Sequence, residues 1–438
     1  MSSEQNPSNE TFDEVHSTSS KKNKSFFHNI ELECNETFDE VNSTSSDYSS
    51  QSNNLELKGC ILKTYNIICE LGRGGFSIVW LAYSISNNNF FALKVQNPDE
   101  YKDGLAEIIF VESLSKNKHT NFINLIEYFV EIKNKDKYLC SVWELHATNL
   151  DCLLRKGNYN NGFSFDIIRN IMLQTIEGLK ILHNKYKVYH GDIKTDNILV
   201  KGVSKRNQFI IDNYLKHNFN ERYNKLKEQH WLESDKTLDT IKNMKKETKF
   251  KIRSKLHKEI NDIVLSKLEQ VDISPYDIDE KYINNMKISI SDFGTFCGEN
   301  DYYDDVFGTR YYYAPEVILG GKCSKTVDIW CLGCLLFELL TGDILFDPIK
   351  DSDHNRDYYH LCLINDTCGD FPKNFLKTTK YYKKYFNSNF KIKDYEYEEN
   401  RLERKLKVRE YYSDEYKYIY SLLKIYLSIE PNKRQLIF

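Results

Sequence analysis

Apolar residues in the first part of the chain recur in short runs that are typical of strands. Such runs cover residues 90–95, 122–129 and 138–145, and two further strand-like runs flank a glycine-rich turn just before them. Residues 105–112, between these runs, have the spacing of a helix. The pattern predicts a small lobe of five strands and one helix at residues 64–145.

The second part of the chain has the spacing of helices. Apolar residues recur every three to four positions from residue 165 to 183, and residues 327–337 form a further apolar helical run. We therefore expect an α+β fold in two lobes, with a larger and mainly helical lobe at residues 146–437.

The amino-terminal segment has a different composition. Residues 1–58 are poor in aromatic residues and rich in Ser, Thr, Asn and acidic residues, so they cannot bury enough apolar surface to offset the entropy of ordering. We expect this tail to be disordered. A twelve-residue peptide at 9–20 recurs at 35–46, with His16 replaced by Asn42 as the only difference. It is either a docking motif used twice or a neutral duplication, and we favour the duplication because two copies are too few for a repeat fold.

A charged insertion interrupts the helical lobe at residues 201–285. It is rich in Lys, Asn and Glu, has helical apolar spacing only in places, and contains a basic stretch from Lys242 to Lys258. One interpretation is a partly ordered docking arm, and the other is a solvated, charged spacer. The composition slightly favours the spacer.

The overall composition narrows the class of protein. The chain has 438 residues, 28% of them charged, and a net charge of −4, so it has no global basic field that would favour nucleic acid. No apolar run approaches the roughly 18 residues of a membrane span, and the amino terminus lacks the apolar segment of a signal peptide. We expect an intracellular, cytoplasmic or nuclear monomer that binds neither membrane nor nucleic acid.

The eleven cysteines are scattered and odd in number, as expected for reduced core residues. Only Cys331 and Cys334 have the spacing of a metal or redox pair, but they lie in an apolar helix without a second ligand pair. We expect no zinc or redox role for them.

A polar loop at residues 189–200 carries the strongest chemical signal. Asp192, Lys194 and Asn197 can aim three groups at one phosphoryl transfer: a base for the attacking hydroxyl, a cation for the moving phosphoryl group and a metal ligand. The loop resembles the H-R-D-L-K-x-x-N element of eukaryotic protein kinases, with Gly191 in place of the usual Arg. The alternative is a polar turn between a helix and a strand.

The resemblance to protein kinases extends to the nucleotide site. Lys94 follows the glycine-rich turn at the spacing of the lysine that holds the nucleotide phosphates, and Glu107 is its expected partner, with Glu112 as a surface alternative. Asp292, in Asp-Phe-Gly, is expected to bind Mg²⁺ together with Asn197. The residues expected to bind ATP are Leu71, Gly72, Arg73, Gly74, Gly75, Phe76, Ser77, Val79, Ala92, Lys94, Glu144 and His146.

Supporting positions occur in kinase order as well. Glu316, in Ala-Pro-Glu, is expected to pair with Arg434, and Asp328 is expected to brace the catalytic loop from below. Trp143 is expected to narrow the pocket behind the adenine. Because every metal and catalytic position is filled, the chain is identified as an active serine/threonine protein kinase that uses ATP and Mg²⁺. Its catalytic residues would be Asp192, Lys194, Lys94 and Glu107.

Four features are similar to the SR-protein kinases, which phosphorylate serines in arginine-serine repeats. They are Ser77 at the third glycine position, the small Gly191, the large insertion, and the sequence of residues 341–348. The general kinase forms of residues 292–294 and 314–316 depart from this branch. A kinase of another branch, or a pseudokinase-like scaffold that binds partners through its tail and insertion, are the alternatives.

Two functional expectations follow from the resemblance. Gly191 has no side chain to receive a phosphate, so we expect activity without phosphorylation between Asp292 and Glu316, where Thr295 and Thr309 are the only Ser or Thr hydroxyls. Acidic residues near the phosphoacceptor site would favour arginine-rich protein substrates. These acids are Glu299, Asp301, Asp304, Asp305, Asp343, Asp347, Asp351, Asp353 and Asp357.

Overall fold

The structure is a computed structural model. It describes residues 57–133, 135–234, 237–274, 276–298, 307–350, 354–398, 401–407 and 414–438. Both copies of the duplicated peptide, and nearly all of the tail expected to be disordered, lie outside these residues.

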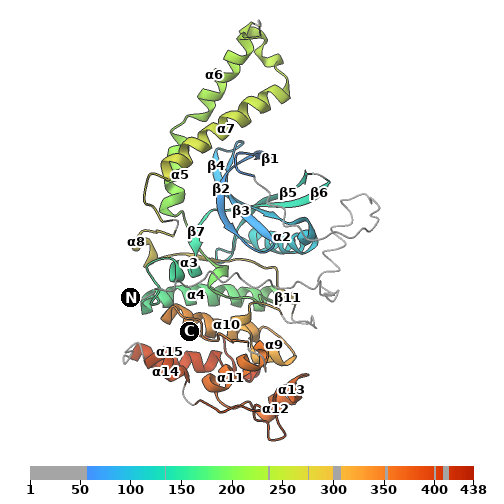
Figure 1. Cartoon of the computed structure of the whole chain (residues 1–438), viewed down its shortest axis with the longest axis vertical. Helices are drawn as coiled ribbons and strands as arrows, with labels where there is room; N and C mark the ends of the chain where they lie inside the picture. The colour runs from blue at the N-terminus through green and yellow to red at the C-terminus, as the bar shows by residue number, and fades with distance from the viewer. Residues whose placement is uncertain are drawn as a thin grey trace, which may run out of the picture.

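The small lobe is built on one antiparallel sheet of six strands in the order β1-β2-β3-β4-β6-β5 (Figure 1). Helix α2 packs against β5 and β6. The expected five strands are present, and the short β1 adds a sixth. The elements are β1 (Ile61–Leu62), β2 (Tyr65–Arg73), β3 (Ser77–Ser84), β4 (Asn89–Gln96), β5 (Leu125–Lys133), β6 (Asp136–Trp143) and α2 (Tyr101–Lys116).

The expected strand at residues 122–129 begins later than its apolar run. Phe122 instead forms an isolated bridge to Ile290, and the amide of Ile123 donates to the carbonyl of Ile290 at 3.0 Å. Phe122 is buried and Ile123 is half-buried where the two lobes meet. The period of the sequence alone does not distinguish such residues from a strand.

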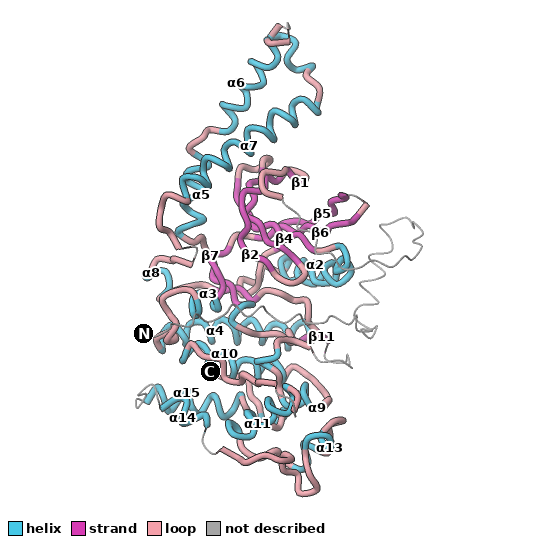
Figure 2. Tube along the Cα trace, viewed as in Figure 1, coloured by secondary structure: helices cyan, strands magenta, loops and turns pink. Residues whose placement is uncertain are grey.

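The larger lobe is mainly helical (Figure 2). Its expected central helices are present as α4, which continues into one π-helical turn at Leu182–Tyr186, and α10. The α+β, two-lobed architecture is confirmed. The helices are α3 (Leu150–Arg155), α4 (Phe165–Ile181), α9 (Pro315–Leu319), α10 (Thr326–Thr341), α11 (Arg356–Cys368), α12 (Lys373–Leu376), α13 (Tyr382–Tyr385), α14 (Arg401–Lys407) and α15 (Asp414–Tyr426).

Two small sheets lie at the top of this lobe. Strands β7 (His146–Asn149), β9 (Ile198–Lys201) and β10 (Ile288–Ile290) form one sheet, with β9 in the middle. Strands β8 (Val188–Tyr189) and β11 (Cys297–Gly298) form the other. The polar loop predicted to be catalytic connects β8 to β9.

The insertion is helical and packs on the small lobe, although it joins β9 to β10 of the large lobe. Side chains of α5 and α7, among them Tyr214, Leu256 and Ile260, form one buried cluster with Leu81 and Phe90 of the small sheet. Figure 1 shows α6 and α7 rising beyond the sheet as an antiparallel arm. The structure supports an ordered insertion and not the solvated spacer. Its helices are α5 (Lys205–Leu215), α6 (Phe219–Leu232), α7 (Lys246–Leu268) and α8 (Glu280–Ile283).

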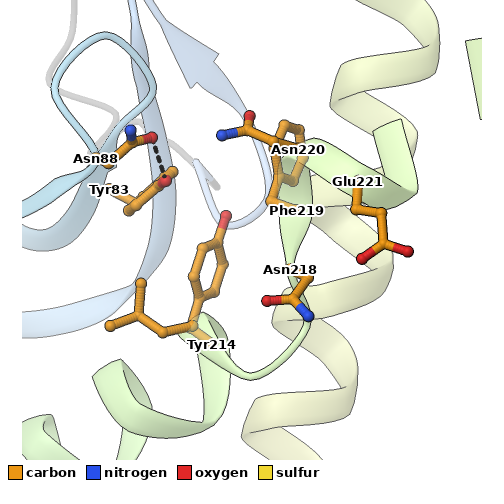
Figure 3. Close-up of a pocket in the computed structure, with 8 residues that line it drawn as sticks. Tyr83, Asn88, Tyr214, Asn218, Phe219, Asn220 and Glu221 are labelled. Carbon is orange, nitrogen blue, oxygen red and sulfur yellow. Dashed lines mark hydrogen bonds between the residues drawn. The ribbon is translucent and has the colours of Figure 1, made fainter. Parts of the chain in front are cut away.

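Buried polar contacts fix the register of the insertion on the sheet. The Asn66 side chain donates to the Asn261 oxygen at 3.1 Å and to the Tyr214 hydroxyl at 3.2 Å, and Asn261 donates to the Ile67 carbonyl at 3.0 Å. Figure 3 shows Tyr83 and Asn88 of the β3–β4 hairpin beside Tyr214, and these residues line a pocket at the elbow between α5 and α6. The composition of the insertion does not predict this docking. Only one side of each helix supplies apolar contact residues, and the many charged residues elsewhere dominate the composition.

Helix α10 forms the centre of the large lobe, and every residue from Val327 to Thr341 is buried. Cys331 and Cys334 are free thiols within it, and burial raises the pKa of both thiols. Within the described ranges, no three His, Cys, Asp or Glu side chains gather as a metal site. None of the helices described is long and apolar enough to cross a membrane.

One carboxylate in α10 is buried at the junction of three elements. Glu338 is 1% exposed and accepts hydrogen bonds from Arg155 at the end of α3 and from the Tyr312 hydroxyl. Burial raises the pKa of Glu338 to about 7, because the contacts with Tyr312 and Arg155 lower it by less than burial raises it. The fold therefore favours the protonated form of this side chain.

We predict that Glu338→Gln changes the pH dependence of stability. Because the folded pKa of about 7 lies above the ordinary 4.5, the wild type loses stability as pH rises through this window, by up to roughly 3 kcal/mol. Gln does not titrate, so the free energy of unfolding of the variant should not show this loss. Urea unfolding of both proteins at pH 5, 6 and 7 measures the difference, and parallel curves would contradict the prediction.

Candidate active site

The polar loop places three predicted residues around one carboxylate. The ammonium of Lys194 lies 2.9 Å from Oδ2 of Asp192. The Asn197 amide donates to the Asp192 carbonyl at 2.8 Å and to Oδ2 at 3.2 Å. Oδ1 of Asp192 is buried and has no hydrogen-bond partner among the described residues. No donor within the described part of the chain therefore occupies the lone pairs of this oxygen.

Asp328 of α10 holds the loop from below, as predicted. Its carboxylate accepts hydrogen bonds from the backbone amides of His190 at 2.9 Å and Gly191 at 2.8 Å, and it contacts the His183 ring at 2.7 Å. Burial of the charge alone would raise the pKa of Asp328, but these contacts outweigh burial and lower it. The side chain is thus kept as an anion that fixes the backbone of the catalytic loop.

Gly191 allows the next segment to pack directly on the loop. Its φ is +82°, and a Cβ here would lie 3.0 Å from the Thr295 carbonyl oxygen and 3.1 Å from the Phe307 ring. The Thr295 hydroxyl donates to the His190 carbonyl at 3.0 Å, and β11 pairs with β8. A residue with a side chain would disturb this packing.

Thr309 contacts the same loop through Lys194. The Lys194 ammonium donates to its hydroxyl at 2.6 Å. Burial opposes the positive charge of Lys194, but Asp192 and the neighbouring acids outweigh burial and raise its pKa. Lys194 therefore stays protonated between Asp192 and the segment that precedes Glu316.

Lys94 of β4 and Glu107 of α2 form the predicted ion pair, with 2.9 Å between ammonium and carboxylate. Burial opposes the charge on Lys94, but the carboxylates of Glu107 and Asp292 outweigh it and raise the pKa of Lys94. The alternative partner, Glu112, pairs instead with Lys116 on the outer side of α2 at 3.3 Å.

Asp292 occupies a backbone conformation that few residues with a side chain adopt, with φ of +62°. The ring of Phe293 next to it is fully buried, 5.5 Å from the Phe110 ring of α2 and 5.0 Å from the His190 ring. Phe293 therefore anchors this turn beneath α2. Anchoring of this kind holds a strained residue in place.

Oxygen donors suited to Mg²⁺ occur together here. Asp292 offers a carboxylate, and Asn197 uses its amide nitrogen to bond Asp192, which leaves the amide oxygen for a metal. One carboxylate, one amide oxygen and nucleotide phosphates form a ligand set that Mg²⁺ prefers. The residues present therefore fit the predicted metal, although their role as ligands remains a prediction.

The glycine-rich turn connects β2 to β3 directly above Lys94. In the sheet, Val79 is paired with Gly72 on one side and with Lys94 on the other. The Gly74 amide donates to the Ser77 carbonyl at 2.9 Å, which closes the turn. A Cβ at Gly72 or Gly75 would meet only open space, so the backbone at these positions is unobstructed.

The other predicted residues of this loop lie around that turn. Arg73 pairs with Glu70 at 2.7 Å and Phe76 is 43% exposed, so neither is buried against the lobe. Leu71 precedes Gly72 in β2, and Ala92 is paired with Trp143 in β4 and β6. Their contacts with nucleotide remain predictions.

The connection between the lobes carries Trp143, Glu144 and His146. Trp143 is buried and donates to the Ser141 hydroxyl at 2.8 Å. The Glu144 amide donates to the Asn124 carbonyl at 3.2 Å, and the His146 ring lies 3.2 Å from the Glu144 carbonyl. The Glu144 amide is therefore already used, so an adenine would have to bond other backbone groups of this stretch.

The predicted anchor of the Ala-Pro-Glu segment is present. Glu316 and Arg434 form a buried bidentate pair at 2.6 and 2.8 Å, and Arg434 also donates to the Thr326 carbonyl. Sequence reasoning missed His183 and Ser291: the first contacts Asp328, and the carbonyl of the second lies 3.0 Å from the His190 ring. A buried histidine at the end of an apolar helix was the available signal for His183.

The acids proposed to attract cationic substrates differ in their surroundings. Asp357 is paired with Arg310 at 2.5 Å and is therefore not a free negative charge, which corrects the expectation for this residue. Asp343 and Asp347 are exposed and lie near Lys405. Glu299, Asp301, Asp304, Asp305, Asp351 and Asp353 lie outside the described residues.

Comparison with known proteins gives a consistent result. The model of the protein kinase domain family matches residues 65–229 and 277–436. A putative serine/threonine-protein kinase of Acanthamoeba polyphaga mimivirus is 28% identical over 74% of this chain and 75% of its own length. The serine/threonine-protein kinase SRPK of Physarum polycephalum is 29% identical over 75% of this chain and 72% of its own. SRSF protein kinase 3 of Mus musculus is 24% identical over 74% and 75%.

The match leaves out residues 230–276, most of the arm that projects from the small lobe. With the family match covering both lobes and the catalytic loop, the chain belongs to the protein kinase family and is a serine/threonine protein kinase similar to the SR-protein kinases.

Proposed function

We propose that this kinase transfers the γ-phosphoryl group of ATP to serine in arginine-rich protein segments, with Asp192 as the base. The observation that carries the catalytic part is the free Oδ1 of Asp192 beside the paired Lys194. The alternative of a scaffold without turnover has no observation in its favour.

Each of the predicted site residues has a distinct role in this proposal. Asp192 orients the serine hydroxyl and takes its proton at Oδ1. Lys194 offsets negative charge on the phosphoryl group as it moves, and Lys94, held by Glu107, positions the nucleotide phosphates. The glycine-rich turn covers them with backbone amides. When bound, Mg²⁺ neutralises charge on the phosphates, and Asn197 and Asp292 would hold it.

We predict that Glu107→Gln lowers kcat/KM for a peptide substrate by about 10-fold or more, because Lys94 loses the partner that fixes its position. Asp192→Asn should lower kcat by about 100-fold or more. Glu112→Gln, on the outer side of the same helix, is the matched control and should retain activity. Labelled phosphate transfer measures all three, with thermal unfolding as a check on folding.

Near wild-type turnover of Asp192→Asn would contradict the assigned base. Equal losses in Glu107→Gln and Glu112→Gln would contradict the role of the Lys94 pair.

The substrate part of the proposal has two supports. Relatives that match three quarters of the chain are named for SR proteins and SRSF factors. On this chain, Asp343 and Asp347 are exposed in the segment that follows α10. Exposed carboxylates attract cationic segments and can bond a guanidinium group with two parallel hydrogen bonds, which an ammonium group cannot do.

We predict that arginine-serine repeat peptides are phosphorylated on serine with kcat/KM at least about 10-fold above matched lysine-serine or acidic peptides. The preference should weaken as salt rises. The double variant Asp343→Asn/Asp347→Asn should raise KM for the arginine peptide. The control Glu228→Gln/Asp272→Asn makes the same charge change on the exposed surface of the insertion and should not. Equal rates on all peptides would remove the substrate proposal and leave the kinase assignment intact.

We further propose a monomer inside the cell, in cytoplasm or nucleus, that acts on proteins and not on nucleic acid. The absence of a global basic charge supports the last point.

A further inference from the structure

The arm formed by α6 and α7 carries a local excess of positive charge that catalysis does not use. Residues 242–259 contain eight Lys or Arg residues and only two acids, Glu247 and Glu259. This is the basic stretch noted in the sequence, and the chain as a whole has a net charge of −4. A local excess of this kind on an acidic protein indicates a binding surface for an anionic segment.

Three of these lysines lie on one side of α7. Lys251, Lys255 and Lys258 are spaced four and three residues apart, so they project from the same face, which we call the lysine face. All three are exposed. Leu256 and Ile260 are buried against the small lobe on the other side of the helix.

The lysine face is only partly neutralised. Lys251 pairs with Glu247 at 3.0 Å. Lys255 and Lys258 form no ion pair with any residue in the described part of the chain. Their charges are therefore available to a partner.

One end of the lysine face lies beside the first described residues of the chain. The side chain of Lys258 lies beside Gly59, and a Cβ at Gly59 would be 3.3 Å from its Cγ. Lys58 approaches Asp262 of the same helix at 3.9 Å. The tail that precedes Leu57 is thus tethered directly at the base of the lysine face.

This tail has the opposite charge. Residues 1–56 contain eleven acids and three lysines. Six of the acids lie in residues 31–47, which contain no Lys or Arg and include the second copy of the duplicated peptide. The acids of that copy are Glu36, Asp39 and Glu40.

The second copy can also reach the face. Residues 42–56, fifteen in all, separate its acidic part, residues 35–41, from Leu57, and a chain of this length spans at most about 50 Å. Lys251 is seven helical residues beyond Lys258, or about 10 Å. The first copy has a longer tether and is followed by Lys21, Lys22 and Lys24, which reduce its negative charge.

We propose that residues 35–41 of the tail dock on the lysine face of α7 in the same molecule. Exposed ion pairs contribute little individually, about 0–1 kcal/mol each. A short tether compensates for this, because it keeps the peptide at an effective concentration of order millimolar. Docking neutralises the lysine face and keeps other polyanions from it, and the first copy can take the place of the second.

Zero-length carbodiimide cross-linking of the full-length kinase tests this proposal. Isopeptide bonds are expected between Glu36, Asp39 or Glu40 and the lysines of the face, identified by mass spectrometry. Their yield should fall about fivefold or more at 0.5 M salt, because the screening length is then only about 4 Å and exposed ion pairs are weakened. A mixture of isotopically light and heavy chains should give bonds within one chain only.

Charge reversal supplies the matched controls. Cross-linking at positions 39 and 40 should be lost in Asp39→Lys/Glu40→Lys, which changes none of the described residues. Cross-linking should be regained when Lys255→Glu/Lys258→Glu is added, now between the lysines at 39 and 40 and the carboxylates at 255 and 258. Lys180→Glu/Lys377→Glu makes the same charge change on exposed lysines of the large lobe and should leave the native cross-links intact.

Three results would overturn the proposal. The first is a yield that does not depend on the charges at 255 and 258, and the second is cross-links mainly between light and heavy chains. The third is the absence of cross-links together with tight binding of a single-stranded RNA oligonucleotide that depends on Lys255 and Lys258, which would assign the face to nucleic acid.

Discussion

The catalytic loop depends on one buried carboxylate. Asp328 is fully buried and accepts the amides of two consecutive loop residues while it contacts His183. Loss of one partner of a buried, charged hydrogen-bond network typically costs about 3–5 kcal/mol, because the remaining groups stay desolvated. Asp328 is carried by α10, in which every residue from Val327 to Thr341 is buried, so the loop is fixed to the core of the large lobe.

From this anchor the site extends upward through direct contacts. Asp328 fixes the backbone of His190 and Gly191, the His190 ring bonds the Ser291 carbonyl, and Asp292 follows in the chain. Phe293 then packs against Phe110 of α2, the helix that supplies Glu107 to Lys94. One continuous set of buried contacts therefore links the loop that carries Asp192 in the large lobe to Lys94 in the small lobe. The insertion adds a second support, because α5 and α7 pack against Leu81 and Phe90 of the same small sheet.

The sequence allowed the two lobes and most of the site to be predicted, because each catalytic role demands a residue type at a fixed spacing. Asp192, Lys194 and Asn197 share one loop, and Lys94 and Glu107 are placed by a strand and the helix after it. Long-range contacts were harder to predict. The insertion is ordered because Tyr214 and Ile260 pack against sheet residues more than a hundred positions earlier in the chain. No local sequence pattern predicts such a contact. The pairing of Asp357 with Arg310 likewise follows from tertiary packing and not from spacing.

We infer that the site is assembled without phosphate on the segment between Asp292 and Glu316. Gly191 has no side chain for a phosphate, and Thr295, β11 and Thr309 already bond the catalytic loop directly. The most direct test is the rate of phosphoryl transfer by the full chain after phosphatase treatment, with mass spectrometry to confirm that residues 292–316 carry no phosphate. Turnover within about twofold of the untreated enzyme is expected. Activity that appears only when Thr295 or Thr309 is phosphorylated would contradict assembly without phosphate.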